Sequence, residues 1–177
     1  MHIKKIVISG IVFFICTVTS LFTHAESTLT LTSPEFADGG ELPQQYSCNG
    51  ADISPSLTIS GAPANTQSFV LIMDDPDAPN GTWLHWLVYN LPSTTTDIPE
   101  NAPTTHTWDD GSMQGRNDWY EAKYGGACPP DGRHRYFFKL YALDIKLELK
   151  KKTSLRKVKK AMKGHILAET KLMAKYG

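Results

Sequence analysis

Two proline-rich segments, about fifty residues apart, constrain the fold of this chain more than any other feature. The first is Asp74-Asp75-Pro76-Asp77-Ala78-Pro79 and the second is Gly125-Gly126-Ala127-Cys128-Pro129-Pro130. Each precedes a histidine near the start of an apolar segment, His85 in the first case and His134 in the second. Because the proline ring fixes φ, such loops lose little conformational entropy on folding. Carboxylates and imidazoles on stiff loops predict a preformed site for a small polar ligand.

The N-terminus has the pattern of a secretory signal. Lys4 and Lys5 precede the mostly apolar segment 6–22, and Thr23-His24-Ala25 offers small residues for cleavage. A membrane anchor is the alternative, but these 17 residues are at the short limit for a span and no basic flank follows. We therefore expect a signal peptide at 1–25, one domain at 26–177, and a periplasmic or secreted location.

Cleavage would remove Cys16 and leave two cysteines, Cys48 and Cys128. Two cysteines in an oxidising compartment predict one disulfide bond, and two buried thiols are the alternative. Neither cysteine lies in a C-x-x-C pair, so a zinc clip is not expected. We expect no metal and no cofactor in this domain.

Alternating or continuous apolar segments predict a mainly β domain. The strongest strand candidates are 68–73, 83–91 and 134–143, and shorter ones lie at 28–32 and 56–59. The first of these is apolar at every position after Ser68, which is typical of a strand buried on both faces.

The segment 92–133 carries no strong strand signal and is rich in Pro, Gly, Thr and Asp. A structureless loop of this length is unusual in a small domain unless it is functional or contains short elements. Because it leads into the second proline-rich segment, we expect it to fold over the ligand site.

The C-terminal region predicts a helix. From Ser154 onward, apolar residues recur at helical spacing at Leu155, Val158, Met162 and Ile166, with Leu172 and Met173 further on. Lysines cover the opposite face, so contact with anionic lipid is one interpretation. Packing of this helix on the β domain is the preferred interpretation, because a single apolar stripe is typical of any surface helix.

Charge is distributed unevenly along the chain. Residues 26–121 contain 14 acidic residues and one basic residue, whereas residues 122–177 contain 4 acidic and 15 basic residues. The preferred interpretation is two differently charged faces, and docking between opposite charges is the alternative. We expect no nucleic-acid partner.

Strand geometry would bring several polar side chains together. If 68–73 and 83–91 are antiparallel neighbours, Asp75 and Asp77 leave one strand where His85 enters the next. His134 and Tyr136 are two residues apart on a strand, so they point to the same face. These side chains are therefore predicted to converge at one end of the sheet.

Several motifs then give the chain a specific resemblance. They are Asp75-Pro76-Asp77-Ala78-Pro79, Trp83-Leu84-His85-Trp86-Leu87-Val88-Tyr89-Asn90, Gln114-Gly115-Arg116-Asn117-Asp118, Tyr124-Gly125-Gly126, Cys128-Pro129-Pro130, His134-Arg135-Tyr136-Phe137 and Leu140-Tyr141-Ala142-Leu143-Asp144. In this order and spacing, over nearly the whole mature chain, the sequence resembles the phosphatidylethanolamine-binding protein family in its bacterial Raf-kinase-inhibitor-like branch.

The resemblance implies a β-sandwich of two mostly antiparallel sheets with peripheral helices, including a C-terminal helix. It also implies a small anion pocket for phosphate-like groups or phosphorylethanolamine head groups, and a cis peptide at Ala78-Pro79. Ala127 stands where bacterial relatives usually have proline. Carried over residue by residue, the pocket would use Asp75, Asp77, His85, Gly126, Pro130, His134 and Tyr136.

Three functions are compatible with the sequence. The preferred one is a non-catalytic binding protein that recognises a phosphorylated or zwitterionic ligand, or inhibits a partner kinase or protease as some members of the family do. The alternative is a metal-dependent hydrolase with His85, His134 and Asp75 as ligands, which suffice for zinc with an open position. The third is an envelope interaction protein whose pocket is vestigial. No G-x-S-x-G motif supports a serine hydrolase.

Overall fold

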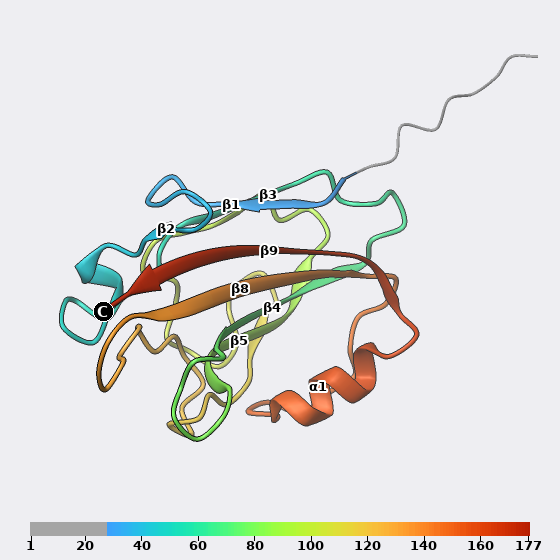
Figure 1. Cartoon of the computed structure of the whole chain (residues 1–177). Helices are drawn as coiled ribbons and strands as arrows, with labels where there is room; N and C mark the ends of the chain where they lie inside the picture. The colour runs from blue at the N-terminus through green and yellow to red at the C-terminus, as the bar shows by residue number, and fades with distance from the viewer. Residues whose placement is uncertain (1–27) are drawn as a thin grey trace, which may run out of the picture.

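The structure, a computed structural model, describes residues 28–177, and the predicted signal segment 1–25 lies outside these residues. The described chain forms two β-sheets, one 3₁₀-helix and one α-helix (Figure 1). The smaller sheet has the order β1-β3-β6 and is antiparallel throughout. Its strands are β1 (Thr30–Thr32), β3 (Leu57–Ser60) and β6 (Asp97–Ile98).

The larger sheet has the order β2-β9-β8-β4-β5-β7. Its neighbours are antiparallel except for β2 and β9, which are parallel. The expectation of two mostly antiparallel sheets is therefore confirmed. Its strands are β2 (Gly40–Glu41), β4 (Ser68–Asp75), β5 (Trp83–Pro92), β7 (Met113–Gln114), β8 (His134–Leu143) and β9 (Ile166–Tyr176).

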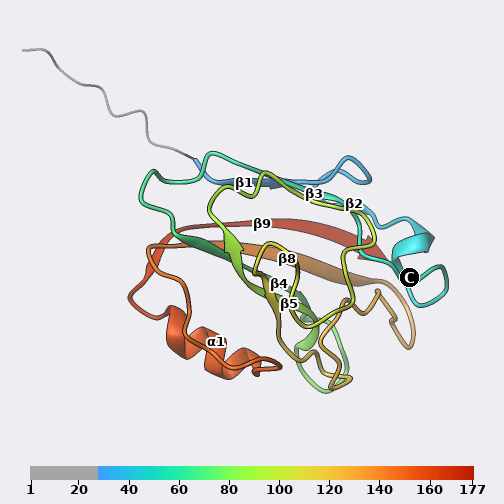
Figure 2. The same cartoon turned by 180° about the vertical axis from the view of Figure 1, so that it is seen from behind.

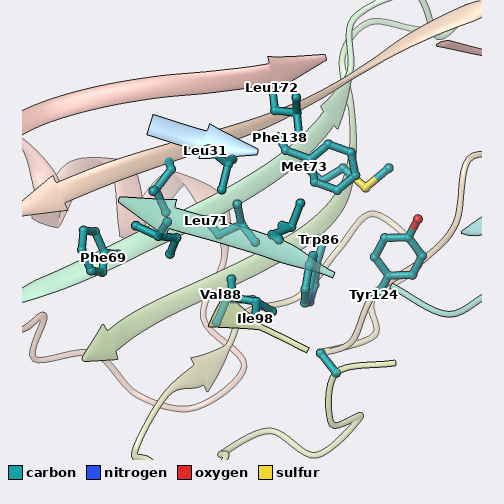
Figure 3. Close-up of a cluster of buried hydrophobic side chains, with 14 of the residues drawn as sticks. Leu31, Phe69, Leu71, Met73, Trp86, Val88, Ile98, Tyr124, Phe138 and Leu172 are labelled. Carbon is teal, nitrogen blue, oxygen red and sulfur yellow. The ribbon is translucent and has the colours of Figure 1, made fainter. Parts of the chain in front are cut away.

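The two sheets enclose the main hydrophobic core. Figure 3 shows Leu31 and Ile98 of the smaller sheet beside Leu71, Trp86 and Val88 of the larger one. All eight residues of β4 are buried, as the apolar segment at 68–73 predicted. Burial of this apolar surface is the main source of stability in such a sandwich.

The opposite face of the larger sheet is covered by α1 (Leu155–Met162) (Figure 1). Val158 and Met162 of this helix are buried against Val70, Ile72 and Leu87. The apolar stripe of α1 therefore packs on the sheet, which is the interpretation that the sequence favoured.

The prediction that the helical pattern continues to the C-terminus is wrong. The helix ends at Met162, and Gly164 takes a left-handed φ of +85° that turns the chain back. Ile166–Tyr176 then pair with β8 along its whole length, from Ile166 opposite Leu143 to Tyr176 opposite His134. This pairing provides hydrogen-bond partners for backbone groups along an edge of β8 that would otherwise be open. Leu172 and Ala174 are both buried, as the two-residue period of a strand requires.

The cis peptide predicted at Ala78-Pro79 is also absent, since no peptide bond among residues 28–177 is cis. Ala78 instead begins a turn in which Gly81 N–H donates to the Ala78 carbonyl. Proline at the second position of such a turn is compatible with a trans bond, because a cis proline belongs at the third position.

The segment 92–133 leaves the larger sheet at the end of β5, passes through β6 of the smaller sheet and returns to β7 at the edge of the larger one (Figure 2). It contains β6 and β7 and otherwise consists mainly of turns. Gln114 anchors it by accepting a hydrogen bond from Trp86 Nε1 at 2.7 Å. A disulfide bond joins Cys128, near the end of this segment, to Cys48, with the two Cα atoms 5.4 Å apart. None of the described helices is long and apolar enough to cross a membrane.

Candidate functional site

The ends of three neighbouring strands place the candidate site. Asp75 is the last residue of β4, His85 lies near the start of β5, and His134 and Tyr136 lie at the start of β8. Because β4 pairs with both β5 and β8 in antiparallel fashion, these residues meet at one end of the larger sheet. We call Asp75, His85, His134 and Tyr136 the histidine cluster.

Asp75 and His134 form a buried pair within the cluster. Nδ1 of His134 donates to Oδ2 of Asp75 at 2.7 Å, and the two residues are 7% and 3% exposed. A carboxylate only accepts hydrogen bonds, so Nδ1 carries the proton and Nε2 is left for another partner. The second oxygen of Asp75 accepts the Asp77 amide at 2.8 Å. Asp75 therefore fixes both the imidazole of His134 and the turn that follows β4.

His85 is held by the glycine turn of the second proline-rich segment. Its Nδ1 lies 2.9 Å from the carbonyl oxygen of Gly125 and 3.1 Å from that of Gly126. Carbonyl oxygens only accept, so Nδ1 carries the proton here too. Burial lowers the pKa of His85 below its ordinary value, although the two carbonyls and Asp75 oppose this effect. His85 is therefore a neutral imidazole near pH 7, with a lone pair on Nε2.

Tyr136 contributes a hydroxyl group that donates no hydrogen bond to another described residue. Its ring packs edge-on against the His85 imidazole, with centroids 5.2 Å apart. The hydroxyl oxygen is buried and has no hydrogen-bond partner among residues 28–177. Burial, assisted by the charge of Asp75, raises the pKa of Tyr136, although the Cys128 backbone amide opposes this effect, so the hydroxyl keeps its proton. A buried donor without an acceptor is costly, which makes it a strong pointer to a ligand.

Asp77 has a different environment from the cluster. Both of its carboxylate oxygens accept hydrogen bonds from the Arg135 guanidinium, at 2.6 and 2.9 Å, and Oδ2 also accepts the Arg135 amide at 2.9 Å. These contacts with Arg135 lower the pKa of Asp77 to about 2. Asp77 therefore ties the turn after β4 to β8, and positions Asp75 rather than offering free oxygens.

The 125–130 turn is shaped by close packing. A Cβ on Gly125 would lie 2.7 Å from the Trp119 ring, and one on Gly126 would lie 2.6 Å from Asp52 Oδ1. The same oxygen of Asp52 accepts the Gly126 amide at 2.6 Å. Gly126 thus serves the site through its carbonyl, whereas Pro130 is exposed at the end of the turn.

Two contributors to the site were missed by sequence reasoning. Trp119 packs edge-on against both His85 and Trp83, with centroids 5.1 and 5.3 Å apart, and is 41% exposed. Asp52 holds the glycine turn from a loop about seventy residues away. Neither has a sequence signal beyond its residue type, because both contacts depend on how distant loops pack together.

The arrangement gives no support to the hydrolase alternative. Within residues 28–177, no three side chains of His, Cys, Asp or Glu are grouped so that they could hold a metal ion. His85 turns Nδ1 toward two carbonyl groups, and His134 turns Nδ1 toward Asp75. Of the three residues proposed as zinc ligands, Asp75 already uses both carboxylate oxygens, one for His134 and one for the Asp77 amide.

Comparison with known proteins gives a consistent result. The family model described as phosphatidylethanolamine-binding protein matches residues 32–177. A UPF0098 protein of Methanothermobacter thermautotrophicus is 46% identical over 148 residues, which cover 84% of this chain and 98% of the relative. A UPF0098 protein of Aquifex aeolicus is 43% identical over 159 residues, which cover 88% and 92%.

Two solved structures show the same likeness in three dimensions. A putative phosphatidylethanolamine-binding protein homologue from Chlamydia trachomatis superposes with a TM-score of 0.79 at 39% identity, covering 85% of this chain and 98% of that one. YbcL of E. coli, described as a new member of the mammalian PEBP family, superposes with a TM-score of 0.76 at 36% identity, covering 84% and 97%.

Proposed function

Because the chain belongs to the phosphatidylethanolamine-binding protein family, we propose that it is a non-catalytic binding protein with a small anion pocket. The pocket is the histidine cluster, and its ligand is a phosphate-like group such as the head group of phosphorylethanolamine. One observation carries this proposal: the Tyr136 hydroxyl is buried beside His85 and has no partner among the described residues. A phosphate oxygen is an acceptor that would satisfy this donor.

The two imidazoles supply the rest of the recognition. With Nδ1 of each ring already donating to the protein, only Nε2 can turn toward a ligand. Protonation at Nε2 makes an imidazole a donor and adds a positive charge. Binding of an anion is therefore coupled to proton uptake at His85, because burial lowers the pKa of this imidazole and the anion favours its charged form.

The proposal includes a protein partner that is inhibited or otherwise modulated, such as a kinase or a protease. Trp119 packs against His85 and is 41% exposed, although large aromatic side chains are usually more buried. Aromatic side chains at the rim of a polar pocket are typical of protein interfaces. The signal segment predicted at 1–25 makes this partner an extracytoplasmic one.

The test is a calorimetric titration of the purified protein with phosphorylethanolamine, using Tyr136→Phe as the main variant. This change removes one hydroxyl and no charge. A lost hydrogen bond to a charged group costs about 1.5–3 kcal/mol, so affinity should fall at least about tenfold.

Tyr141→Phe is the matched control, because Tyr141 lies on the same strand but packs on the opposite face of the sheet. It should leave the affinity unchanged. Equal affinity of the Tyr136→Phe variant and the unmodified protein would contradict the proposal.

A further inference from the structure

A concave site lies on the face of the larger sheet opposite the histidine cluster. It is a cleft of about 560 Å³ between the N-terminal end of α1, the loop joining β4 to β5, and the loop that follows β7. We call it the α1 cleft. Figures 1 and 2 both show the start of α1 next to the β4–β5 loop. Its volume is in the range of sites that bind small molecules, about 300–1,000 Å³.

The α1 cleft is separate from the histidine cluster because adjacent residues of β4 point to opposite faces. Asp75 belongs to the cluster, and Asp74 lines the cleft. The same alternation holds on β5, where His85 belongs to the cluster and Leu84 lines the cleft. The two sites therefore share strands but no side chain.

The lining of the cleft carries a net positive charge. Four basic side chains and two acidic ones give a formal charge of +4 − 2 = +2, the members being Arg116, Lys139, Arg156, Lys159, Asp74 and Asp118. Lys139 is paired with Asp74 at 2.6 Å. Within residues 28–177, Arg116, Arg156 and Lys159 take part in no ion pair. Their charge is available to an anion.

The start of α1 adds donors to this charge. Ser154 is the N-cap, but its side chain makes no capping hydrogen bond and the first turn holds no acidic residue. The Lys157 amide donates to the Ser154 carbonyl, but the helix offers no acceptor to the amides of Leu155 and Arg156, and its dipole favours an anion there. Arg116 is fixed at this position by its own amide, which donates to the Thr153 carbonyl at 2.9 Å.

Two charges on the helix oppose its dipole. Arg156 and Lys157 lie in the first turn of a helix that begins at Leu155, where cations are unfavourable, whereas Lys159 and Lys160 lie in the last turn, where cations are favourable. A bound anion removes this conflict. Without one, the cations of the cleft repel each other and the positive end of the helix dipole.

Asp74 supplies an observation that is independent of the helix. The residue is 2% exposed, and one carboxylate oxygen is bonded to Lys139. The other oxygen, Oδ1, is buried and has no hydrogen-bond partner in the described part of the chain. An unpartnered carboxylate oxygen calls for a donor, which a bare phosphate ion lacks in its dianionic form.

We propose that the α1 cleft binds a small organic phosphate that also carries a hydroxyl or amino group. The phosphate lies against the start of α1, where Arg116, Arg156 and Lys159 surround it. The hydroxyl or amino group donates to Oδ1 of Asp74 at the buried end of the cleft. This second site acts independently of the histidine cluster.

The test is a calorimetric titration of the purified protein with sn-glycerol 3-phosphate, inorganic phosphate and glycerol at constant ionic strength. Glycerol 3-phosphate should bind saturably and more tightly than inorganic phosphate, and glycerol should not bind. No saturable heat from either phosphate compound would overturn the proposal.

Two lysines of α1 provide a matched pair of variants. Lys159 lines the cleft, whereas Lys160, next to it on the same helix, does not. Lys159→Ala should weaken binding about threefold to fivefold, and Lys160→Ala should leave it unchanged. Equal losses in both variants would indicate diffuse attraction to a basic helix and overturn the proposal.

Two further variants separate the sites and test Asp74. His85→Ala should leave glycerol 3-phosphate binding unchanged, and loss of binding in this variant would assign the ligand to the histidine cluster instead. Asp74→Asn, checked for an intact melting transition, should remove the preference for glycerol 3-phosphate over inorganic phosphate. A retained preference would show that Asp74 does not bind the ligand.

Discussion

The two faces of the larger sheet, at the end where β4 stops, carry sites built in different ways. On one face, the histidine cluster consists of buried groups that hydrogen bonds within the fold hold in place, except for the Tyr136 hydroxyl, and a disulfide-linked turn closes around it. On the other face, the α1 cleft has three exposed cations on a helix and a loop, namely Arg116, Arg156 and Lys159. Asp75 and Asp74, adjacent in sequence, anchor the two sites.

The two sites should therefore respond differently to amino-acid substitution. Substitutions in the histidine cluster should lower the free energy of unfolding, because removing one group leaves another buried polar group without a partner. Substitutions of the cations in the α1 cleft should lower ligand affinity more than stability, because exposed charges contribute little to the free energy of unfolding. The predictions below test this contrast, beginning with the largest expected effect.

Removal of the disulfide bond should have the largest effect on stability. Cys48 and Cys128 are 80 residues apart, so in the chain-entropy model the bond contributes about 4 kcal/mol to the free energy of unfolding. The double variant Cys48→Ser/Cys128→Ser, measured by urea denaturation, should lose this amount.

The same variant should distinguish the two faces. The 125–130 turn would loosen around His85, so phosphorylethanolamine affinity should fall, while glycerol 3-phosphate affinity should persist. Equal weakening of both ligands would show that the sites are not independent.

The same substitution at adjacent residues should give opposite results. Asp75→Asn should weaken phosphorylethanolamine binding, because His134 loses its charged partner, and should leave the α1 cleft unaffected. Asp74→Asn should do the reverse, because Asp74 bonds Lys139 and lines the cleft. Each change should cost about 1–3 kcal/mol of stability, since both carboxylates are buried. Calorimetric titration and denaturation of the two variants would test this, and an effect of either on both ligands would contradict it.

The histidine cluster should also respond to pH. Burial lowers the pKa of His85, so the unfolded chain takes up a proton at a higher pH than the folded one. Its stabilising contribution is fully present above about pH 6.5, the ordinary pKa of histidine, and is lost as pH falls toward the folded pKa. Denaturation midpoints measured across this range should show a smaller slope in His85→Gln. His165→Gln, an exposed residue, is the control and should retain the slope.

Anion affinity should change in the opposite direction. Protonated His85 carries charge, so affinity should rise as pH falls below about 6.5. Sulfate is a suitable probe, because its charge is constant over this range. An affinity for sulfate that does not change with pH would remove His85 from anion recognition.

The smallest effect is expected at Asp77. Its partner Arg135 is exposed, so Asp77→Asn should cost less than about 1 kcal/mol at pH 7. Because Arg135 lowers the pKa of Asp77 to about 2, this contribution is present above pH 3.8 and is lost as pH falls through about 2. Acid denaturation of the variant and the unmodified protein would measure it. A large loss of stability at pH 7 would contradict the limited role given to Asp77.

Much of the histidine cluster could be predicted from the sequence, because it depends on local rules. The two-residue period places His134 and Tyr136 on one face, and the short loop between β4 and β5 places Asp75 near His85. The family resemblance and the two-sheet architecture followed from motifs that are continuous in sequence.

The rest depends on contacts between distant segments. Apolar residues after Met162 fit a helix as well as a strand, and only pairing with β8 decides for the strand. Trp119 and Asp52 reach the site from loops whose packing has no sequence period. The α1 cleft combines Asp74, Arg116 and Arg156, which are brought together only by the assembled fold.

The most direct test of the central claim is a histidine-selective nitrogen-15 NMR titration with phosphorylethanolamine. If the histidine cluster is the anion pocket, the Nε2 signals of His85 and His134 should shift saturably at a 1:1 ratio, toward the protonated form. The signals of His106 and His165 should stay unchanged. Saturable binding that leaves the His85 and His134 signals unmoved would contradict the assignment of the pocket to these residues.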